Sequence, residues 1–326
     1  MSTTDRFKKS RDVGCAYLLK QRGEHGEFPA EEPELVGYYK TLTAFQVCGF
    51  NDVANQLCRW IRTEGMTRDG DFGPKGELAT GYAYAYFNAW VVMGAHRLGQ
   101  LDIAEKGADF LQGFNDEQTG GFFSSRDERS TETKQDLMVV SMCGLAFLVG
   151  GRLEIARRVG AWLKTLMELQ PDFPQRLYTV YSQAHGLHTV PEPGQELRYL
   201  VVADAQEDQA FFNAGIAAAF LCRLFQATGE TEWLELAKTY MRFAEVASDA
   251  LFRLIRAGKV GWAASLLFNL TREEKYREMA IRIGNNLVGL QHNEGWWPGA
   301  GQTAPSNDST AERVVWMDEI AQVADG

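Results

Sequence analysis

Two kinds of apolar pattern alternate along the whole chain. In the first kind, apolar residues recur at helical spacing on one side only, as in residues 273–291 and 231–247. In the second kind almost every position is apolar, as in residues 211–225 and 261–270. A helix that is apolar on all sides must be buried on all sides. The pattern therefore predicts half-exposed helices that alternate with fully buried ones, in about six pairs that end with residues 309–323.

Six outer helices around six inner helices form the simplest layered arrangement for this alternation, so we predict an all-α (α/α)6 toroid. No long stretch rich in Pro, Gly and Ser divides the chain, and residues 1–326 are predicted to form a single domain. Buried segments pass to the next half-exposed segment through short turns. The opposite connections are long and place glycine beside an aromatic residue, as in Gly120-Gly121-Phe122. Because long loops carry function more often than short ones, we expect the site where the inner helices begin and a plain surface at the other end.

One long connection, at about residues 171–203, is an insertion. It contains two β-branched and aromatic runs, residues 177–181 and 197–202, on either side of the turn Pro191-Glu192-Pro193-Gly194. These runs predict a β-hairpin. Two interpretations of the insertion remain: it forms a lid over the mouth of the barrel, or it is a surface loop without a function.

Charge and composition narrow the classes of partner. The formal net charge is −10, and the basic residues are scattered among acidic ones, which argues against binding to nucleic acid or to an anionic membrane. The longest apolar run, residues 137–151, is too short to span a bilayer. The five cysteines are widely spaced, no pair has metal-ligand spacing, and there is no signal-peptide pattern. We therefore expect a cytoplasmic protein with reduced thiols, no metal, no cofactor and a small-molecule substrate.

Short motifs resemble those of known toroidal enzymes. The segment Leu290-Gln291-His292-Asn293-Glu294-Gly295-Trp296-Trp297 resembles the glutamine–tryptophan repeat of terpenoid cyclases and protein prenyltransferases. Residues 115–123 are similar to barrel loops of N-acylglucosamine 2-epimerases, and residues 134–138 are loosely similar to unsaturated glucuronyl hydrolases. These resemblances imply the toroid fold. They imply no catalytic set, because the acidic motif of the cyclases, the zinc ligands of the prenyltransferases and the histidine pair of the epimerases have no clear match.

Acidic residues near the predicted starts of inner helices are the first candidates for catalysis. Asp136 directly precedes an apolar helix, where it would act as an acid or base or simply cap the helix. Asp204 and Asp208 lie four residues apart and would share one face of a helix, where they would divide acid and base roles or form a solvated first turn. His185, in the insertion, is a candidate base or a surface residue without a role.

Aromatic residues cluster at the same helix starts and would wall a ligand pocket or pack against the outer ring. Lys259 and Glu312 also lie there. The predicted substrate-binding residues are Tyr38, Tyr39, Tyr82, Tyr86, Trp262, Arg313 and Trp316.

Three functions fit these features. The first is a cofactor-independent cyclase or isomerase of an isoprenoid or polyketide, as in secondary metabolism. It would work by acid-initiated cyclisation or as a pericyclase of the Diels–Alder type, which holds a reactive substrate folded. The second is a carbohydrate enzyme, either a sugar 2-epimerase or an unsaturated-uronide hydrolase, with Asp136 and Asp208 facing each other across the lumen. The third is a binding or scaffold protein with a filled lumen. A lumen mouth that is polar and lacks a contiguous aromatic wall would contradict the first function.

Overall fold

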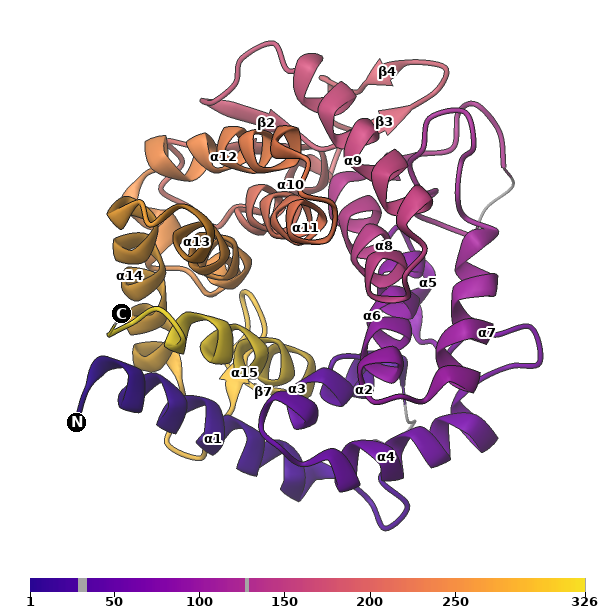
Figure 1. Ribbon diagram of the computed structural model, residues 1–326, viewed down its shortest axis with the longest axis vertical. Helices are drawn as coiled ribbons and strands as arrows, with labels where there is room; N and C mark the ends of the chain where they lie inside the picture. The colour runs from indigo at the N-terminus through magenta and orange to yellow at the C-terminus, as the bar shows by residue number, and fades with distance from the viewer. Residues whose placement is uncertain (29–33, 127–128, 326) are drawn as a thin grey trace.

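Within the residues that the structure describes, twelve principal helices form two concentric rings around a central lumen (Figure 1). The computed structural model describes residues 1–28, 34–126 and 129–325. The outer helices are α1 (Thr3–Gln21), α4 (Asn51–Trp60), α7 (Leu101–Gln112), α9 (Leu153–Glu168), α12 (Thr231–Val246) and α14 (Glu274–Leu290). The inner helices are α3 (Thr41–Val47), preceded by the short α2 (Leu35–Tyr38), then α6 (Tyr84–Arg97), α8 (Leu137–Val149), α11 (Phe212–Thr228), α13 (Gly258–Thr271) and α15 (Asn307–Ala321). The predicted (α/α)6 toroid is confirmed.

Burial follows the two predicted patterns. On the outer helix α14, the buried stripe includes Tyr276, Ile283 and Leu287, and the other face is exposed. On the inner helices α8 and α11, buried residues surround the helix. The ring closes where α1 packs against α15, and the backbone N–H groups of Thr3 and Thr4 donate to the carboxylate of Asp325 at 3.2 and 3.0 Å. The hydrophobic effect therefore explains both the alternation of the helices and the ring that they form.

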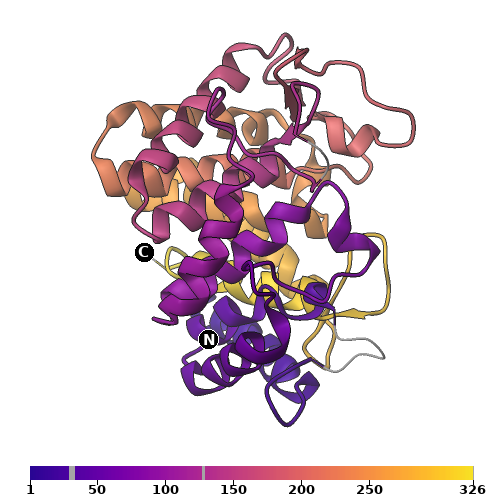
Figure 2. The same cartoon turned by 90° about the vertical axis from the view of Figure 1, so that its right-hand side faces the viewer.

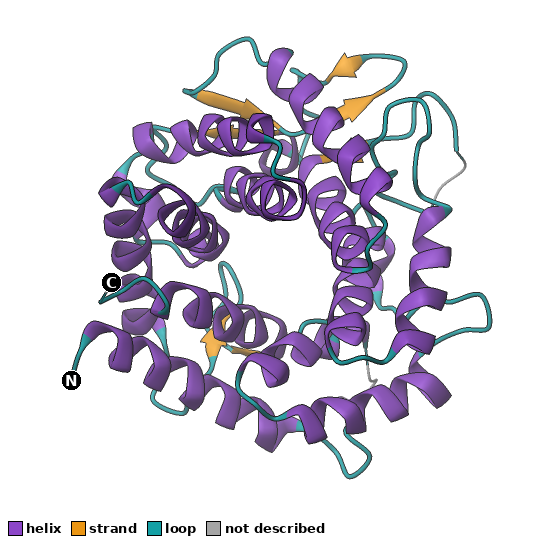
Figure 3. Cartoon of the chain, viewed as in Figure 1, coloured by secondary structure: helices purple, strands orange, loops and turns teal. Residues whose placement is uncertain are grey.

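The strands of the described residues lie in the long connections, as Figure 3 shows. In the insertion, β2 (Arg176–Tyr178) pairs antiparallel with β5 (Leu200–Val202), and Leu177 lies opposite Val201. This is the pairing that the hairpin prediction requires, with the short α10 (Glu196–Tyr199) added before β5. The neighbouring β3 (Val180–Ser182) pairs with β4 (Gly186–Leu187) and with β1 (Gln135–Asp136), the residues that precede the inner helix α8. The insertion is thus attached to the start of an inner helix.

The shorter strands β6 (Trp297–Pro298) and β7 (Pro305–Ser306) form a second small hairpin, in the connection before α15. In Figure 2 this loop, drawn in yellow, projects from the same side of the ring as the insertion. The remaining elements are the π-helical turn η1 (Ile61–Gly65), α5 (Glu77–Thr80), and the 3-10 turns η2 (Asp249–Phe252) and η3 (Ile255–Ala257). Among the described residues, no helix combines the length and the apolar character needed to cross a membrane.

The segment that resembles the glutamine–tryptophan repeat has a structural role. The side-chain amide of Gln291 accepts from Ser10 Oγ at 2.6 Å and donates to the Ser10 carbonyl at 3.0 Å, which ties α14 to α1. The Trp297 indole N–H donates to the carbonyl of Leu287 at 2.7 Å. Gly295 has a φ of 101°, a conformation that favours glycine. The motif therefore fixes the corner between two helices, and none of these contacts leaves a group free for chemistry.

Close packing of two inner helices gives a first testable prediction. A Cβ at Gly215 on α11 would lie 2.4 Å from backbone atoms of Lys259 and Val260 on α13. We expect Gly215→Ala to lower the free energy of unfolding by about 1–3 kcal/mol, because backbone must shift to admit the methyl group. Gly289→Ala on the exposed face of α14, where a Cβ meets nothing within 4 Å, is the matched control and should stabilise by about 0.5–1 kcal/mol. Denaturant unfolding measures both, and equal effects would contradict the prediction.

Candidate functional site

A cavity of about 320 Å³ opens in the lumen where the inner helices begin. This is the end at which the long connections led us to expect a site. Its aromatic wall comprises Tyr39, Tyr82, Tyr86, Phe87, Phe212 and Trp316. Its charged wall comprises Lys40, Arg256, Lys259, Asp308, Glu312 and Arg313.

The charged residues of the cavity lie at or near the N-terminal ends of inner helices. Asp308 and Glu312 lie four residues apart in the first turns of α15, so they share one face of that helix. The side chain of Ser306 caps the same helix by accepting from the Ser309 N–H at 3.1 Å. Lys259 is the second residue of α13, and Lys40 lies between α2 and α3. The parallel direction of the inner helices therefore brings charges from distant parts of the sequence to one rim.

Glu312 is the centre of a buried ionic cluster. Its carboxylate contacts the Nζ atoms of Lys259 and Lys40, the latter at 3.1 Å, and Nη1 of Arg313 at 2.8 Å. Lys40 also contacts Asp308 Oδ1 at 2.8 Å. Burial alone would raise the pKa of Glu312, but the attraction of Lys259, Lys40 and Arg313 prevails and lowers that pKa well below its usual range. Glu312 is therefore ionised whenever the protein is folded at neutral pH.

The cluster carries an excess of positive charge. Three cations face two carboxylates, which leaves one net positive charge at the rim of the cavity. Arg313 is only 6% exposed, and its Nε atom has no hydrogen-bond partner among the described residues. Asp308 is the most accessible member, with 33% of its side chain exposed. The arrangement suits a ligand whose oxygen atoms bear or develop negative charge, with a carboxylate beside it.

The aromatic side chains form the rest of the wall. Tyr39 packs edge-on against Phe87, with ring centroids 4.7 Å apart, and the Lys40 ammonium lies 4.9 Å from the Tyr39 ring. Burial raises the pKa values of Tyr39 and Tyr86, so both phenols stay protonated and can donate hydrogen bonds.

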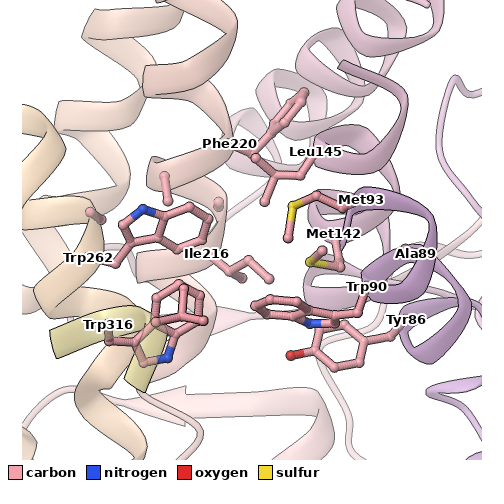
Figure 4. Close-up of a cluster of buried hydrophobic side chains, with 14 of the residues drawn as sticks. Tyr86, Ala89, Trp90, Met93, Met142, Leu145, Ile216, Phe220, Trp262 and Trp316 are labelled. Atoms are coloured by element: carbon pink, nitrogen blue, oxygen red, sulfur yellow. The ribbon is translucent and has the colours of Figure 1, made fainter. Parts of the chain in front are cut away.

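Three buried tryptophans from different inner helices, labelled in Figure 4, lie at the inner side of this cavity, which Trp316 lines. Trp316 stacks on Trp262 with centroids 4.5 Å apart and an interplanar angle of 19°, and its ring centroid lies 5.8 Å from that of Trp90. We call Trp90, Trp262 and Trp316 the tryptophan layer. Trp316 lines the cavity, whereas Trp262 faces the opposite end of the lumen.

The predicted substrate-binding residues divide into two groups. Tyr39, Tyr82, Tyr86, Arg313 and Trp316 meet around the cavity, with Tyr86 on α6 and Tyr82 in the loop that precedes this helix. Tyr38 and Trp262 do not line it. The Tyr38 hydroxyl donates to the Gly73 carbonyl at 2.6 Å, and its ring packs edge-on against Trp60 at 5.3 Å, so it joins the inner and outer rings.

Asp136 anchors the insertion. Both of its carboxylate oxygens accept from the Arg198 guanidinium, Oδ1 from Nε at 2.7 Å and Oδ2 from Nη2 at 2.8 Å. It occupies the N-cap position of α8, but its side chain makes no capping hydrogen bond. The prediction that the Asp136 side chain caps α8 is therefore wrong. Its catalytic role stays a prediction, and both of its carboxylate oxygens are already engaged in a bidentate ion pair.

This ion pair gives a second prediction. We expect Arg198→Ala to lower the free energy of unfolding by about 1–3 kcal/mol, because Asp136, which is 3% exposed, loses its charged partner. Cleavage within residues 171–203 under limited proteolysis should become faster. Arg176→Ala, at a half-exposed arginine of β2, is the control and should change neither measurement. Equal protease sensitivity of the two variants would count against an anchoring role.

The other predicted catalytic residues lie apart from the ionic cluster. The expectation that Asp204 and Asp208 share a helical face is wrong, because α11 begins only at Phe212 and both residues lie in the preceding loop. Asp204 is exposed, and Asp208 pairs with Arg256 at 3.0 Å. Asp136 and Arg256 border a small adjoining cavity of about 70 Å³. Asp136 and Asp208 are each paired with an arginine, and their arrangement across the lumen stays a prediction.

His185 is exposed on the insertion, where its Nε2 lies 2.7 Å from Glu132 Oε2. It lines neither of the cavities just described.

Two members of the cluster, Lys40 and Asp308, had not been singled out from the sequence. Asp308 lies four residues before Glu312, and Lys40 directly follows Tyr38 and Tyr39. Both residues could have been found in the sequence, because each is a charged residue close to a residue that we had already assigned to the predicted site. Among the described residues, no group of three or more His, Cys, Asp or Glu side chains is placed to hold a metal ion. Independence from metals and cofactors stays a prediction.

Comparison with known proteins identifies the fold but no family. No protein-family model matches the chain, and no curated protein matches it in sequence. The fold is shared with solved enzyme structures. A D-mannose isomerase superposes with a TM-score of 0.70 at 11% identity, over 97% of each chain. An unsaturated glucuronyl hydrolase specific for heparin gives 0.69 at 14% identity, over 99% of this chain and 98% of the other. The GH76A alpha-1,6-mannanase from Salegentibacter sp. HEL1_6 gives 0.67 at 12% identity, over 97% and 99%.

The first predicted function is therefore wrong. That function was an isoprenoid or polyketide cyclase of secondary metabolism, either acid-initiated or a pericyclase. The structural neighbours are instead named as enzymes that act on sugars. Five buried or half-buried charged groups also line the cavity beside its aromatic wall, and charges are costly to leave facing an apolar substrate. The resemblance to terpenoid cyclases is limited to a corner motif with structural contacts.

Proposed function

We propose that this protein is a carbohydrate-active enzyme that isomerises or epimerises a small sugar in the cavity between Tyr39 and Trp316. The observation that carries the proposal is the buried cluster of Lys40, Lys259 and Arg313 around Glu312, with the accessible Asp308 beside it. The likeness of the fold to D-mannose isomerase supports it. This choice develops the carbohydrate alternative and replaces the scaffold alternative, which required a lumen without a cavity.

The cavity has the size and wall composition that a monosaccharide needs. Its volume of about 320 Å³ is at the lower end of the range for small-molecule sites. Aromatic rings pack against the apolar C–H faces of a sugar, and charged groups bind its hydroxyl oxygens. Tyr39, Phe212 and Trp316 offer the first kind of contact, and Lys40, Lys259 and Arg313 offer the second.

The chemistry that fits is proton transfer beside a carbonyl group. In the open-chain form of an aldose, a base removes the proton from the carbon next to the carbonyl, and the electron pair moves to the carbonyl oxygen to give an enediolate. To give the ketose, the hydroxyl proton on the deprotonated carbon moves to the former carbonyl oxygen, and a proton is returned to the former carbonyl carbon. Return of a proton to the other face of the deprotonated carbon regenerates the carbonyl group and gives the epimer. Asp308 is placed to be the base, and Lys40 and Lys259 are placed to stabilise the oxyanion. Glu312 would act as a positioning residue that holds the cations.

The state of Glu312 favours this chemistry over glycoside hydrolysis. A glycosidase needs one protonated carboxylic acid to protonate the leaving oxygen. The low pKa of Glu312, due to its three cationic neighbours, makes it unsuited to that task. The cations suit an enediolate, which becomes negatively charged during the reaction.

An exchange experiment tests the proposal. The protein would be incubated in D₂O with a panel of unphosphorylated aldoses and ketoses and followed by proton NMR. We expect interconversion of one aldose with its ketose or epimer, with deuterium entering at the carbon next to the carbonyl. Cleavage of an unsaturated uronide disaccharide or of an α-1,6-mannan, without exchange into a free sugar, would overturn the proposal. So would the absence of any turnover across the panel.

A further inference from the structure

A second cavity of about 450 Å³ lies at the other end of the lumen, where the inner helices end. Its walls come from the last turns of α6, α8 and α11 and from α13 and α15. The tryptophan layer lies between it and the proposed sugar site. Figure 4 shows this layer, with Met93, Leu145 and Phe220 beyond it on the side away from Tyr86. This end of the ring carries the short turns, where the sequence led us to expect a plain surface without a site.

The body of this cavity is apolar and partly aromatic. It is lined by Trp90, Met93, Leu145, Leu148, Val149, Trp262, Val315 and Trp316. The Trp262 side chain is 5% exposed, and its indole Nε1 has no hydrogen-bond partner among the described residues. A flat apolar ligand would cover the tryptophan rings, and an acceptor atom on it would satisfy this N–H group.

The rim of the cavity is charged and unbalanced. Arg223 pairs with Glu319 at 2.9 Å, which leaves Arg97, in the last turn of α6, without a carboxylate within 4.0 Å among the described residues. Two cations against one carboxylate give the rim one net positive charge from its side chains. A planar guanidinium beside an apolar wall suits the carboxylate of a ligand, which it can bind through two parallel hydrogen bonds.

We propose that this second cavity binds a flat, apolar small molecule that carries one carboxylate, with its rings on the tryptophan layer and its carboxylate on Arg97. The site is separate from the proposed sugar site and does not depend on it. Asp308 and Lys40 lie at the opposite mouth and line none of it.

Calorimetry with naphthoate, and with naphthylmethanol as its neutral counterpart, tests this proposal. We expect one naphthoate per chain, bound about tenfold more tightly than the alcohol. Ala227→Trp places a bulky side chain at an exposed position of the cavity wall and should weaken the binding of both probes at least about tenfold. Arg97→Glu should abolish the preference for naphthoate and leave the binding of naphthylmethanol unchanged.

Controls separate this site from the sugar site and from misfolding. Asp308→Asn, at the opposite mouth, should bind naphthoate like the unmodified protein. Thermal unfolding should show that Ala227→Trp and Arg97→Glu remain folded, since both positions are exposed. Binding of naphthoate that is unchanged in Ala227→Trp, or equal affinity for the two probes in the unmodified protein, would overturn the proposal.

Discussion

Asp308→Asn is expected to reduce the rate of sugar interconversion by about 100- to 10,000-fold, the usual contribution of a general base. Asparagine has nearly the same shape but cannot accept the proton from the carbon next to the carbonyl. The side chain is one-third exposed and contacts Lys40, so the substitution should change folding little. The loss should lie mainly in kcat, because the sugar would still bind to the same aromatic and cationic walls. Deuterium exchange at that carbon should fall by the same factor.

The matched control is Asp204→Asn. Asp204 is an exposed acid near the same end of the barrel, and it does not line the cavity. Its replacement should leave kcat and KM within about twofold of the unmodified protein, as expected for a substitution far from the reacting atoms. If both variants retained activity, the base would have to be sought elsewhere in the cavity.

Glu312→Gln is expected to lower the free energy of unfolding by about 3 kcal/mol. Glutamine fills the same space, but it leaves Lys40, Lys259 and Arg313 close together without the carboxylate that neutralises them. Lys259 and Arg313 are each 6% exposed, so water compensates little for the lost ion pairs. Chemical denaturation at neutral pH measures the change. The exposed residue Glu278 offers a control, since Glu278→Gln should alter stability by less than about 0.5 kcal/mol.

The effect of Glu312 on stability should depend on pH with a definite sign. Its folded-state pKa lies well below the usual range, so the folded protein binds this proton less readily than the unfolded chain does. The stabilisation is therefore complete above the ordinary pKa of about 4.3 and is lost as the pH falls toward the folded-state value. The difference in unfolding free energy between the unmodified protein and Glu312→Gln should narrow below about pH 4.3. A difference that is constant from neutral to acidic pH would contradict the assignment of the cluster.

The sequence predicted the fold well because the signal is repeated. Each outer helix has one exposed face and each inner helix has none. Two consecutive pairs of outer and inner helices are therefore enough to predict that the same pair recurs along the chain. The direction of the inner helices also indicated the end that bears the charged cavity, which is lined by Tyr39, Tyr86, Arg313 and Trp316. The second cavity, at the end expected to be plain, was not predicted.

The ionic contacts could not be predicted in the same way, because they join residues far apart in the chain. Asp136 and Arg198 are separated by 62 positions, and Lys259 and Glu312 by 53. Periodicity shows which face of a helix is buried but not which charge on another element it meets. The sequence therefore predicts an acid, a base or a helix cap at Asp136, but not its pairing with Arg198. It also predicts a helix for the loop that holds Asp204 and Asp208, because helical spacing alone does not show where a helix begins.

The tryptophan layer makes the lumen two separate chambers instead of a tunnel. With Trp262 stacked on Trp316, a sugar bound in the proposed site would have to leave by the opening through which it entered. Product departure and substrate entry then compete for one passage, which is bordered by the segment that Arg198 fastens to Asp136. The turnover rate of such an enzyme would depend on how fast the product leaves through that single entrance.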